Sequence, residues 1–545
     1  MRNNTGIPLN EVRPLRSAKI LALAVAALGS TGAFAFQIDT GNPDLTVTWG
    51  NTVRYNAGWR MDDRSRRIAN SNTSDEGTFS YDKGANVTNR FDLLTELDVD
   101  FRREMGFRVS AAAWKDFAFN EKVRFNRRLF SQSSYRGDHF SDTTEHFHKE
   151  GGEFLDAYVY KNFSLGDMSG DIKVGRHTVL WGEALILSPF SVSHNQAPTD
   201  AIKALNTPGV DAKEIMLPIG QVSANLQVTP TLSLAAQYYY EWRNSRAPQG
   251  GTYLGSTDFV LDGPHRAHIG PFTLASRDFD KPEDRGDFGI AARWSPDWLG
   301  GTLGLYYRDF TEKSAVASLA VRPGGYYEYF FPENQKLIGL SLAKSIGGVS
   351  VGAEVVRRED AVLNSTITDG THNAARGDAW TALLNGMVLF GPNKVWSSAS
   401  FVAELGYSYL EKVTKNEAYF NRCRGIRDEE AGCSSRDNSM IALRFTPTWT
   451  AVVPGWDASV NMALTYGLHG NSALVLPDHG QEKAGSWSIG TTWTYNARHD
   501  FTLAYIDYLA TNVDDPTSAN PFSRWTNGSQ RQDRGWLSFT YKGSF

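Results

Sequence analysis

The sequence has very little cysteine and no long hydrophobic run beyond its N-terminal region. Only two of its 545 residues are cysteines, Cys423 and Cys433, which excludes a fold framed by several disulfides. No later segment has the roughly 18 or more apolar residues that a membrane-spanning helix needs. The net charge of −5 is mild for this length and does not indicate a nucleic-acid partner.

The first 35 residues have the pattern of a bacterial secretory signal peptide. The basic residues Arg13, Arg16 and Lys19 precede an apolar run, Ile20–Leu28, and an A-x-A cleavage motif ends at Ala35. The apolar run is too short to cross a bilayer. We therefore expect this segment to be removed and the mature protein to lie outside the cytoplasm.

The mature chain is rich in aromatic residues that alternate with polar ones. Aromatic residues make up 12% of the sequence, yet the mean hydropathy is −0.38. In the terminal stretch LSFTYKGSF, Leu537, Phe539 and Tyr541 would face one side of a strand, and Ser538 and Thr540 the other. A barrel with a lipid-facing outside and a wet inside needs only every second residue to be apolar.

Short turns and long polar segments alternate along the chain. Eight short turns rich in Gly, Pro, Asn and Asp lie between segments that read as strands, and several of the other connections are long. This alternation is typical of an outer-membrane barrel with tight periplasmic turns and long outer loops. We predict an all-β, antiparallel transmembrane barrel of about 16–18 strands over residues 36–545. The short turns are at 103–106, 164–170, 229–231, 295–301, 345–348, 390–394, 452–455 and 496–500.

The last strand should close the barrel against the first, because an open edge in lipid would leave backbone groups unpaired. Tyr541 and the terminal Phe545 resemble the C-terminal signal that the barrel-assembly machinery recognises in outer-membrane proteins. Basic clusters in the predicted outer loops could pair with lipopolysaccharide phosphates, although ordinary solvated charge explains them equally well.

One connection breaks the pattern of polar loops. The segment at 184–219 is partly apolar, contains several prolines and carries a possible short helix at 199–205. An apolar loop of this length exposed to water would be a liability. We expect it to fold into the barrel as a plug or constriction, because irregular backbone is tolerated at membrane depth when protein encloses it. A packed extracellular lid is the alternative.

Three blocks of the sequence resemble a known family. EFLDAYVYKNFSLG, IKVGRHTVLWGEALI and IKALNTPGVDAKEIMLPIGQV are similar, in this order, to a proteobacterial outer-membrane family catalogued as domain of unknown function 1302. The resemblance implies an outer-membrane barrel without established catalytic residues. It also suggests possible partners, because genes for family members often lie beside those for a periplasmic lipoprotein-carrier-like protein and efflux-type inner-membrane transporters.

Charged residues on the strands should point into the lumen, since charge on the lipid face is destabilising. They could set selectivity or bind substrate, or they could simply brace the wall as ion pairs. A site near the start of the inward segment would use Arg176, Trp181 and Glu183. The other candidate lumen residues are acidic: Glu96, Asp98, Asp100 and Asp156.

Cys423 and Cys433 are ten positions apart in a long predicted outer loop. The chain crosses an oxidising periplasm, so we predict a disulfide that restrains this loop. No motif for an enzyme, metal or cofactor site appears with its required context, so we expect neither catalytic activity nor a cofactor.

The sequence thus predicts a bacterial outer-membrane channel or transporter, and the family resemblance suggests hydrophobic or amphipathic organic molecules as its substrates. A general diffusion porin is the alternative. A non-transporting envelope scaffold or adhesin is a third reading, and it would have a sealed lumen with binding confined to the outer loops.

Overall fold

The computed structural model describes most of the chain from residue 36 onward. The predicted signal peptide, residues 1–35, lies outside the described residues. The described ranges are 36–71, 73–269, 271–320, 324–365, 372–423, 432–476, 480–510 and 529–545.

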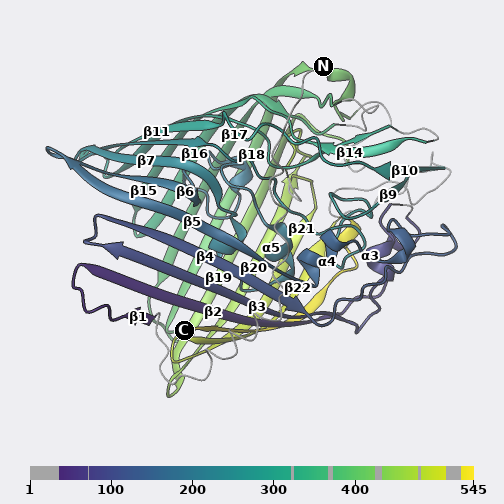
Figure 1. The fold of residues 1–545 in the computed structure, drawn as a ribbon, viewed down its shortest axis with the longest axis horizontal. Coiled ribbons are helices and arrows are strands. Elements are labelled where there is room, and N and C mark those ends of the chain that lie inside the picture. Colours follow the sequence, from purple (N-terminus) through teal and green to yellow (C-terminus); the bar gives the residue numbers. More distant parts are fainter. Residues whose placement is uncertain are drawn as a thin grey trace, which may run out of the picture.

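Eighteen antiparallel strands form one closed barrel in the described chain, and the short β1 (Phe36–Ile38) adds to the sheet at its short-turn end by pairing with β2 alone. Consecutive barrel strands are hydrogen-bonded neighbours, which is the simplest up-and-down order. Figure 1 shows the barrel from the side. The strands are β2 (Leu45–Arg60), β3 (Asn86–Phe101), β4 (Met105–Asp116), β5 (Glu150–Leu165), β6 (Met168–His177), β7 (Ile219–Thr229), β8 (Leu232–Tyr239), β11 (Phe288–Trp294), β12 (Gly301–Phe310), β15 (Gln335–Ile346), β16 (Val349–Val362), β17 (Arg376–Phe390), β18 (Ser398–Lys415), β19 (Asp437–Val453), β20 (Trp456–His469), β21 (Gly485–Tyr495), β22 (His499–Leu509) and β23 (Trp536–Ser544).

The two ends of the barrel sheet meet as the sequence predicts. β23 pairs with β2 in an antiparallel register that places Tyr541 opposite Tyr55. The backbone N–H of Asn51 donates to the carbonyl of the terminal Phe545, and the N–H of Phe545 donates to Asn51, both at 2.8 Å. Tyr541 also packs on Phe501, with ring centroids 5.2 Å apart. Closure satisfies the edge groups that lipid could not. Recognition of this end by the assembly machinery stays a prediction.

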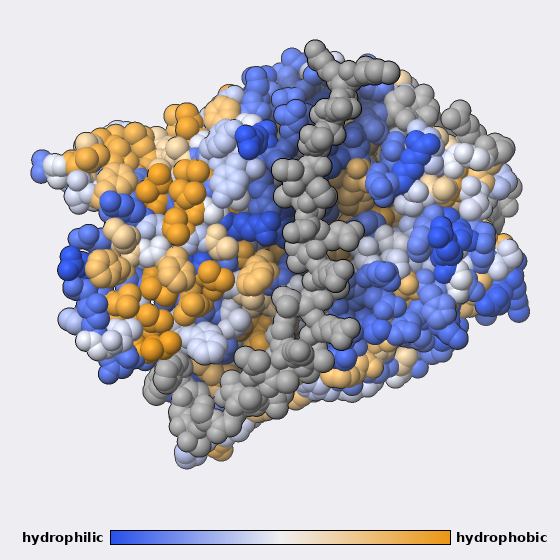
Figure 2. Space-filling view, in the orientation of Figure 1, coloured by the Kyte–Doolittle hydropathy of each residue, from blue (hydrophilic) through white to orange (hydrophobic). Residues whose placement is uncertain are grey.

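Side chains alternate between a wet inside and an apolar outside. On β18 the outward Leu405 and Tyr407 are about 40% exposed, whereas the inward Glu404 and Ser408 are buried. Figure 2 shows apolar side chains gathered over the strands in the left half of this face, and mostly hydrophilic ones over the outer loops on the right. A closed barrel with such a belt is built for a lipid bilayer, and the protein is a bacterial outer-membrane β-barrel.

No helix among the described residues has the length and apolar character required to cross a membrane.

The connections differ sharply at the two ends of the barrel. Eight connections are short turns, at the positions that the sequence predicts, and nine are longer. Under the usual orientation the short turns face the periplasm. The longer connections carry α2 (Arg66–Ala69), α3 (Glu76–Phe79), α4 (Asp142–His148) and a small sheet of β9 (Arg266–Ile269), β10 (Phe272–Ser276), β13 (Val316–Leu319) and β14 (Tyr326–Phe330). These elements lie at the right of Figure 1.

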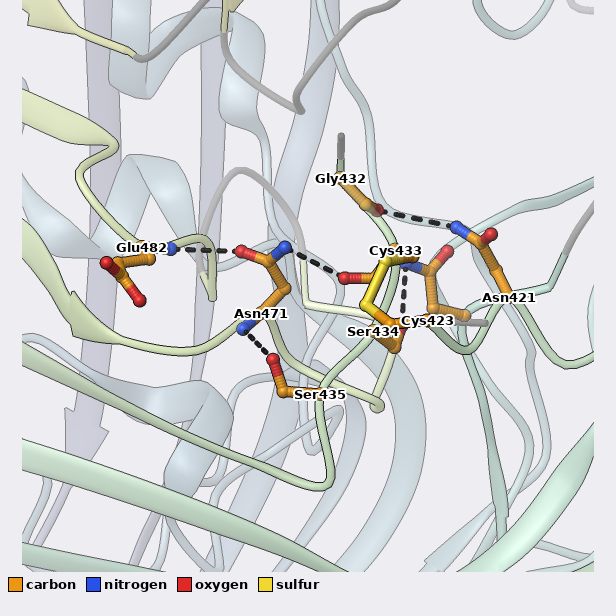
Figure 3. Close-up of a disulfide and its surroundings, with 9 residues drawn as sticks. Asn421, Cys423, Gly432, Cys433, Ser434, Ser435, Asn471 and Glu482 are labelled. Atoms are coloured by element: carbon orange, nitrogen blue, oxygen red, sulfur yellow. Dashed lines mark hydrogen bonds between the residues drawn. A yellow bond between two sulfur atoms is a disulfide. The ribbon is translucent and has the colours of Figure 1, made fainter. Parts of the chain in front are cut away.

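The predicted disulfide is present in one of these outer loops. Cys423 and Cys433 are joined, and their Cα atoms lie 5.0 Å apart. Figure 3 shows Asn471 beside them, whose side chain donates to the Cys433 carbonyl at 2.8 Å. The backbone N–H of Ser434 donates to the carbonyl of Asn421 at 2.7 Å. The disulfide therefore closes the loop between β18 and β19 on itself, and the hydrogen bond from Asn471 ties this loop to the one after β20.

The lipid-facing wall gives a direct test of the assigned inside and outside. Leu340 lies mid-strand on the outward face of β15 and is 59% exposed. Replacing it with Arg should destabilise the barrel by about 2–4 kcal/mol, the cost of a cation near the bilayer midplane. Urea unfolding in vesicles would measure the loss.

The matched control is Ile346→Arg on the same face of the same strand. Ile346 ends β15 beside a short turn and is 57% exposed, so its environment is close to the headgroups. Its substitution should cost only about 0–1 kcal/mol. Equal losses at both positions would contradict the depth assigned to Leu340.

Candidate functional site: a loop across the lumen

The connection between β6 and β7 folds into the barrel. It runs from residue 178 to 218 and contains η2 (Ser188–Phe190), α5 (Ala201–Asn206) and α6 (Ala212–Ile215). Below we call this segment the plug. Leu187, Phe190 and Val192 within it are fully buried. The short helix predicted at 199–205 forms as α5, two residues later at its start and one residue later at its end. Asp200 is its N-cap.

Two wall carboxylates hold the first half of the plug. Glu404 of β18 accepts hydrogen bonds from the backbone N–H groups of Leu185, at 2.9 Å, and Ile186, at 2.6 Å, as well as from that of Leu187. A carboxylate is a strong acceptor, and three successive N–H groups pointing at one side chain fix the local backbone.

Glu354 of β16 performs the same role nearby. It accepts from the N–H of Glu183, from the N–H of Val192 at 2.7 Å and from the hydroxyl of Ser191 at 3.0 Å. The two carboxylates together hold both ends of the turn at 183–192. Since both side chains are almost fully buried, these bonds replace hydration that the carboxylates have lost.

Wall donors bind the plug carbonyls in the same region. Arg308 of β12 donates to the carbonyls of Val192, at 3.0 Å, and His194, at 2.6 Å. The hydroxyl of Thr381 on β17 donates to Phe190 at 2.8 Å. Acceptors and donors on one wall therefore satisfy much of the irregular backbone, as such a segment requires at membrane depth.

The second half of the plug is bound to strands that lie far from β16–β18 in the barrel. Glu214 pairs with Arg54 of β2 at 2.7 Å, and Asp211 pairs with Lys542 of β23 at 2.6 Å. Further back, Lys203 pairs with Glu153 of β5 at 3.2 Å. The plug thus crosses the lumen from β16–β18 to β2, β5 and β23.

Apolar packing explains why this segment lies inside. Phe190 packs with wall residues in a buried cluster, and a Cβ added at the inward Gly406 would lie 2.6 Å from its ring. Trp181 sits against β11, where a Cβ at Gly289 would lie 2.8 Å from its indole. These two wall glycines leave room for large plug side chains.

An inner cavity of about 900 Å³ lies between the plug and the short turns. Trp181 lines it together with inward polar residues of β6, β7 and β8, such as Asp171, Asn225 and Ser233. Arg293 of β11 also lines it and lies 3.6 Å from Glu183. Trp181 therefore lines this cavity, and Glu183 lies beside it through Arg293; a role for either residue in binding stays a prediction.

The predicted acidic lumen residues gather around one arginine. Arg108 of β4 bonds to Glu96, lies 3.1 Å from Asp98 and lies 3.5 Å from Asp156. Glu96 also pairs with Lys213 of the plug. Asp100 lies further along the same inward row and accepts a hydrogen bond from the Tyr160 hydroxyl at 2.5 Å. Most of this group braces the wall and the plug.

Arg176 does not face the lumen, contrary to the expectation from sequence. On β6 it shares the side of the exposed Ile172 and Val174, while His177 points inward. Arg176 lies at the outer end of its strand, where its Nε donates to Glu241 at 2.9 Å. An ion pair at the membrane edge makes a charge on this side tolerable. A role for Arg176 in a lumen site is therefore not supported by its position.

A smaller outer cavity of about 340 Å³ lies beyond the end of β8. Its lining combines aromatic and charged side chains from the outer loops, a combination that the sequence did not single out. They include Phe147, Trp242, Phe279, Arg243, Arg246 and Lys281. The segment at 244–246 also bonds to the plug, because the N–H of Arg246 donates to the Thr199 carbonyl at 2.8 Å. The plug thus separates an inner cavity from an outer one.

Three buried carboxylates meet within the outer loops. Asp258 accepts from the N–H groups of Asp75, at 3.0 Å, and Glu76, at 3.2 Å. Burial and mutual repulsion raise the pKa of Glu76 and Asp258, and burial raises that of Asp75. Among the described residues, no group of three or more His, Cys, Asp or Glu side chains has an arrangement that could hold a metal ion.

This cluster should make the outer loops less stable as pH rises. In the unfolded chain these acids ionise in the ordinary range near pH 4, whereas in the folded loops they hold their protons to higher pH. The folded form therefore binds more protons, and its stability falls as pH increases above that range. We expect a loss of at least about 1.4 kcal/mol in local opening free energy between pH 5 and 9, the value of one pKa unit.

Hydrogen exchange of residues 73–80, corrected for intrinsic rate, would measure this loss. Glu76→Gln is the matched variant, because one oxygen of Glu76 accepts from Ser134 and the other has no hydrogen-bond partner in the described chain. The amide should keep the first contact and flatten the pH dependence. A pH response unchanged in this variant would assign the effect to other groups.

Comparison with known proteins gives solved structures of similar fold and one matching family. Among curated proteins, none matches the sequence. The solved structures with similar folds include a BenF-like porin from Pseudomonas fluorescens Pf-5, with 10% identity, 92% of this chain and 98% of that chain covered, and a TM-score of 0.40. They also include OccAB2 from Acinetobacter baumannii, with 9% identity, 94% and 99% covered, and a TM-score of 0.41.

A family described as "Protein of unknown function (DUF1302)" matches residues 16–545. The match spans the barrel, the plug and the outer loops, and it agrees with the resemblance seen in the three sequence blocks around the plug. The chain therefore belongs to the DUF1302 family.

Proposed function

We propose that this protein is a plugged outer-membrane channel for amphipathic or hydrophobic organic molecules. The observation that carries the proposal is the position of the plug between two cavities, with Trp181 lining the inner one and Trp242 the outer one. An eighteen-stranded barrel is wide enough to leave an aqueous lumen unless something fills it. A segment bonded from wall to wall suits selective passage better than free diffusion.

The lining of the two cavities supports the choice of substrate. The inner cavity combines Trp181 with a polar wall, and the outer cavity combines aromatic rings with cations. Sites for organic molecules are typically concave, with apolar surface and a few placed polar groups. A general porin would instead present a continuous polar lumen.

Vesicle experiments would test this proposal. Proteoliposomes with the wild-type protein should pass small sugars poorly, and should pass an amphipathic dye faster than empty vesicles do. Rapid, size-limited sugar flux would favour the general porin. Absence of any flux, with folding confirmed by heat-modifiable mobility on gels, would favour an envelope scaffold or adhesin.

Envelope partners remain predictions within the same proposal. A periplasmic lipoprotein-carrier-like protein would receive or deliver a water-insoluble substrate at the short turns, and an efflux-type inner-membrane transporter would supply energy. Lipopolysaccharide would contact the outer loops. Crosslinking from a residue in the turn at 164–170 would detect a periplasmic partner, and a clean control from the outer loops would show its specificity.

A further inference from the structure

The outer cavity has the features of a binding site rather than of a gap between loops. It is bounded by residues that follow β8, by Phe147 near the end of α4, and by the outer-loop segments near residues 261 and 279. Its volume of about 340 Å³ falls at the lower end of the range for small-molecule sites. A ligand of one or two rings with a small head group would fill it.

One side of the outer cavity is aromatic. Trp242 packs edge-on against Phe331, with centroids 4.5 Å apart, and Phe279 contacts the same ring at 5.7 Å. Phe147 lines the cavity with the guanidinium of Arg246 held 4.8 Å from its centroid. Fixed rings of this kind offer stacking surface to an aromatic ligand.

The other side of the outer cavity has an incompletely compensated cation. Glu153 already pairs with Arg246 at 2.7 Å and with Lys203 at 3.2 Å. Arg243 lies 3.8 Å from the same carboxylate, too far for a hydrogen bond, so three cations share it. Asp200 adds one further negative charge, at 2.9 Å from Arg246, which leaves this group of five with a net charge of +1.

Burial makes this charge costly. It lowers the pKa of Arg243, and the neighbouring Arg246 lowers it further. An anion placed beside Arg243 would favour its charged form and so oppose both effects. The lining includes one acid, Asp262, whose own pKa is raised by burial, which weakens its opposition to an anion.

Trp242 contributes only a small part of its surface to the outer cavity, because it is 5% exposed. Trp242 and Arg243 are adjacent in sequence and both line the cavity.

We propose that the outer cavity binds an aromatic carboxylate, with its ring against Trp242 and Phe279 and its carboxylate beside Arg243. This inference rests on the proposed channel function and specifies the substrate class. It also connects the site to the plug. Arg243 donates to the carbonyl of Pro218, the last plug residue, at 2.9 Å, and Arg246 pairs with Asp200 at the start of α5.

Calorimetric titration of the folded barrel in detergent would test the site, with 2-naphthoate as the probe and neutral 2-naphthamide as its isostere. We expect naphthoate to bind at least about tenfold more tightly than the amide. Arg243→Gln should remove most of this difference without weakening the amide. Lys281→Gln should weaken naphthoate by only a few-fold, since Lys281 is 55% exposed and already paired with Asp284.

Arg422→Gln is the matched control, because Arg422 is a partly exposed cation in the disulfide loop. Its affinity for naphthoate should equal that of the wild type. Equal affinities for acid and amide, or a loss in Arg422→Gln as large as in Arg243→Gln, would overturn the assignment. If Arg243→Gln fails to fold, Lys281→Gln still tests the site. An affinity for naphthoate that is unchanged in Lys281→Gln would count against the cationic site.

Binding and transport are separable in this design. Specific binding of naphthoate without flux in vesicles would keep the site and reject the channel. Flux of an amphipathic dye without naphthoate binding would keep the channel and reject the site.

Discussion

Deleting residues 188–208 and joining the ends with a short Gly-Ser linker should turn a nearly silent protein into a conducting pore. The deletion removes η2 and α5 and with them Phe190, Val192 and Lys203, three of the buried plug residues. Barrels of 16–18 strands leave an aqueous channel when nothing fills them. We expect single-channel conductance in planar bilayers to rise at least about tenfold, as in an open porin of this strand number.

The matched control removes residues 316–330, which include β13 and β14 of the small outer sheet. Shortening this outer loop leaves every wall contact of the plug described above in place. Its conductance should stay at the wild-type level. Conductance that rises in this control and not in the plug deletion would identify an outer lid as the barrier. Silence from both proteins, when folded, would reject a pore and favour a scaffold.

The barrel itself could be predicted from the sequence because its determinants are local. Alternation such as that of Leu537 to Tyr541 reports which side of a strand is apolar, and Gly, Pro, Asn and Asp mark the turns. Closure between β2 and β23 followed from the need to leave no edge in lipid. Residues such as Glu96, Asp98 and Asp156 could be assigned to the lumen by the same reasoning.

The plug contacts could not be predicted, because they join residues far apart in sequence. Glu354 and Glu404 are single carboxylates on inward faces, with nothing local to distinguish them from other wall charges. Their partners lie about 160–220 positions away. Only the folded loop shows that they bind backbone N–H groups rather than solvent or substrate.

Arg176 is a prediction that is wrong for a different reason. The rule that charged strand residues face the lumen does not hold at the end of a strand. A charge on β6 was expected to face inward, yet the strand parity set by Ile172 and Val174 places it outward. The rule fails where a strand leaves the apolar belt and a partner such as Glu241 is within reach. Sequence alone does not mark that depth.

The second large effect is expected when the plug is kept but its two carboxylates are neutralised. In Glu354→Gln/Glu404→Gln, each amide retains one acceptor oxygen where the carboxylate offered two, and its NH2 group would face plug N–H donors. Hydrogen bonds to buried charged groups contribute about 1.5–3 kcal/mol each, and an unsatisfied donor costs about 1–3 kcal/mol. Weakening of the seated plug by several kcal/mol should produce openings in single-channel records.

The amplitude of these openings distinguishes two ways in which the plug could move. Openings as large as the steady current of the deletion mutant would mean that the plug leaves the lumen as one unit. Smaller openings would mean that only the turn at 183–192 detaches, while the ion pairs of Glu214 with Arg54 and Asp211 with Lys542 hold the second half. Hydrogen exchange that increases in 183–192 alone would support the second case.

Glu411→Gln provides the control for this experiment, because Glu411 lies on β18 with Glu404 but is partly exposed and bonds to Trp380 rather than to the plug. Exposed substitutions of this kind usually change stability by less than about 0.5 kcal/mol. Its records should stay silent. If the double variant is equally silent and its 183–192 amides remain protected, then Glu354 and Glu404 are not what keeps the plug seated, and apolar packing of Phe190 and Leu187 against the wall must carry that role.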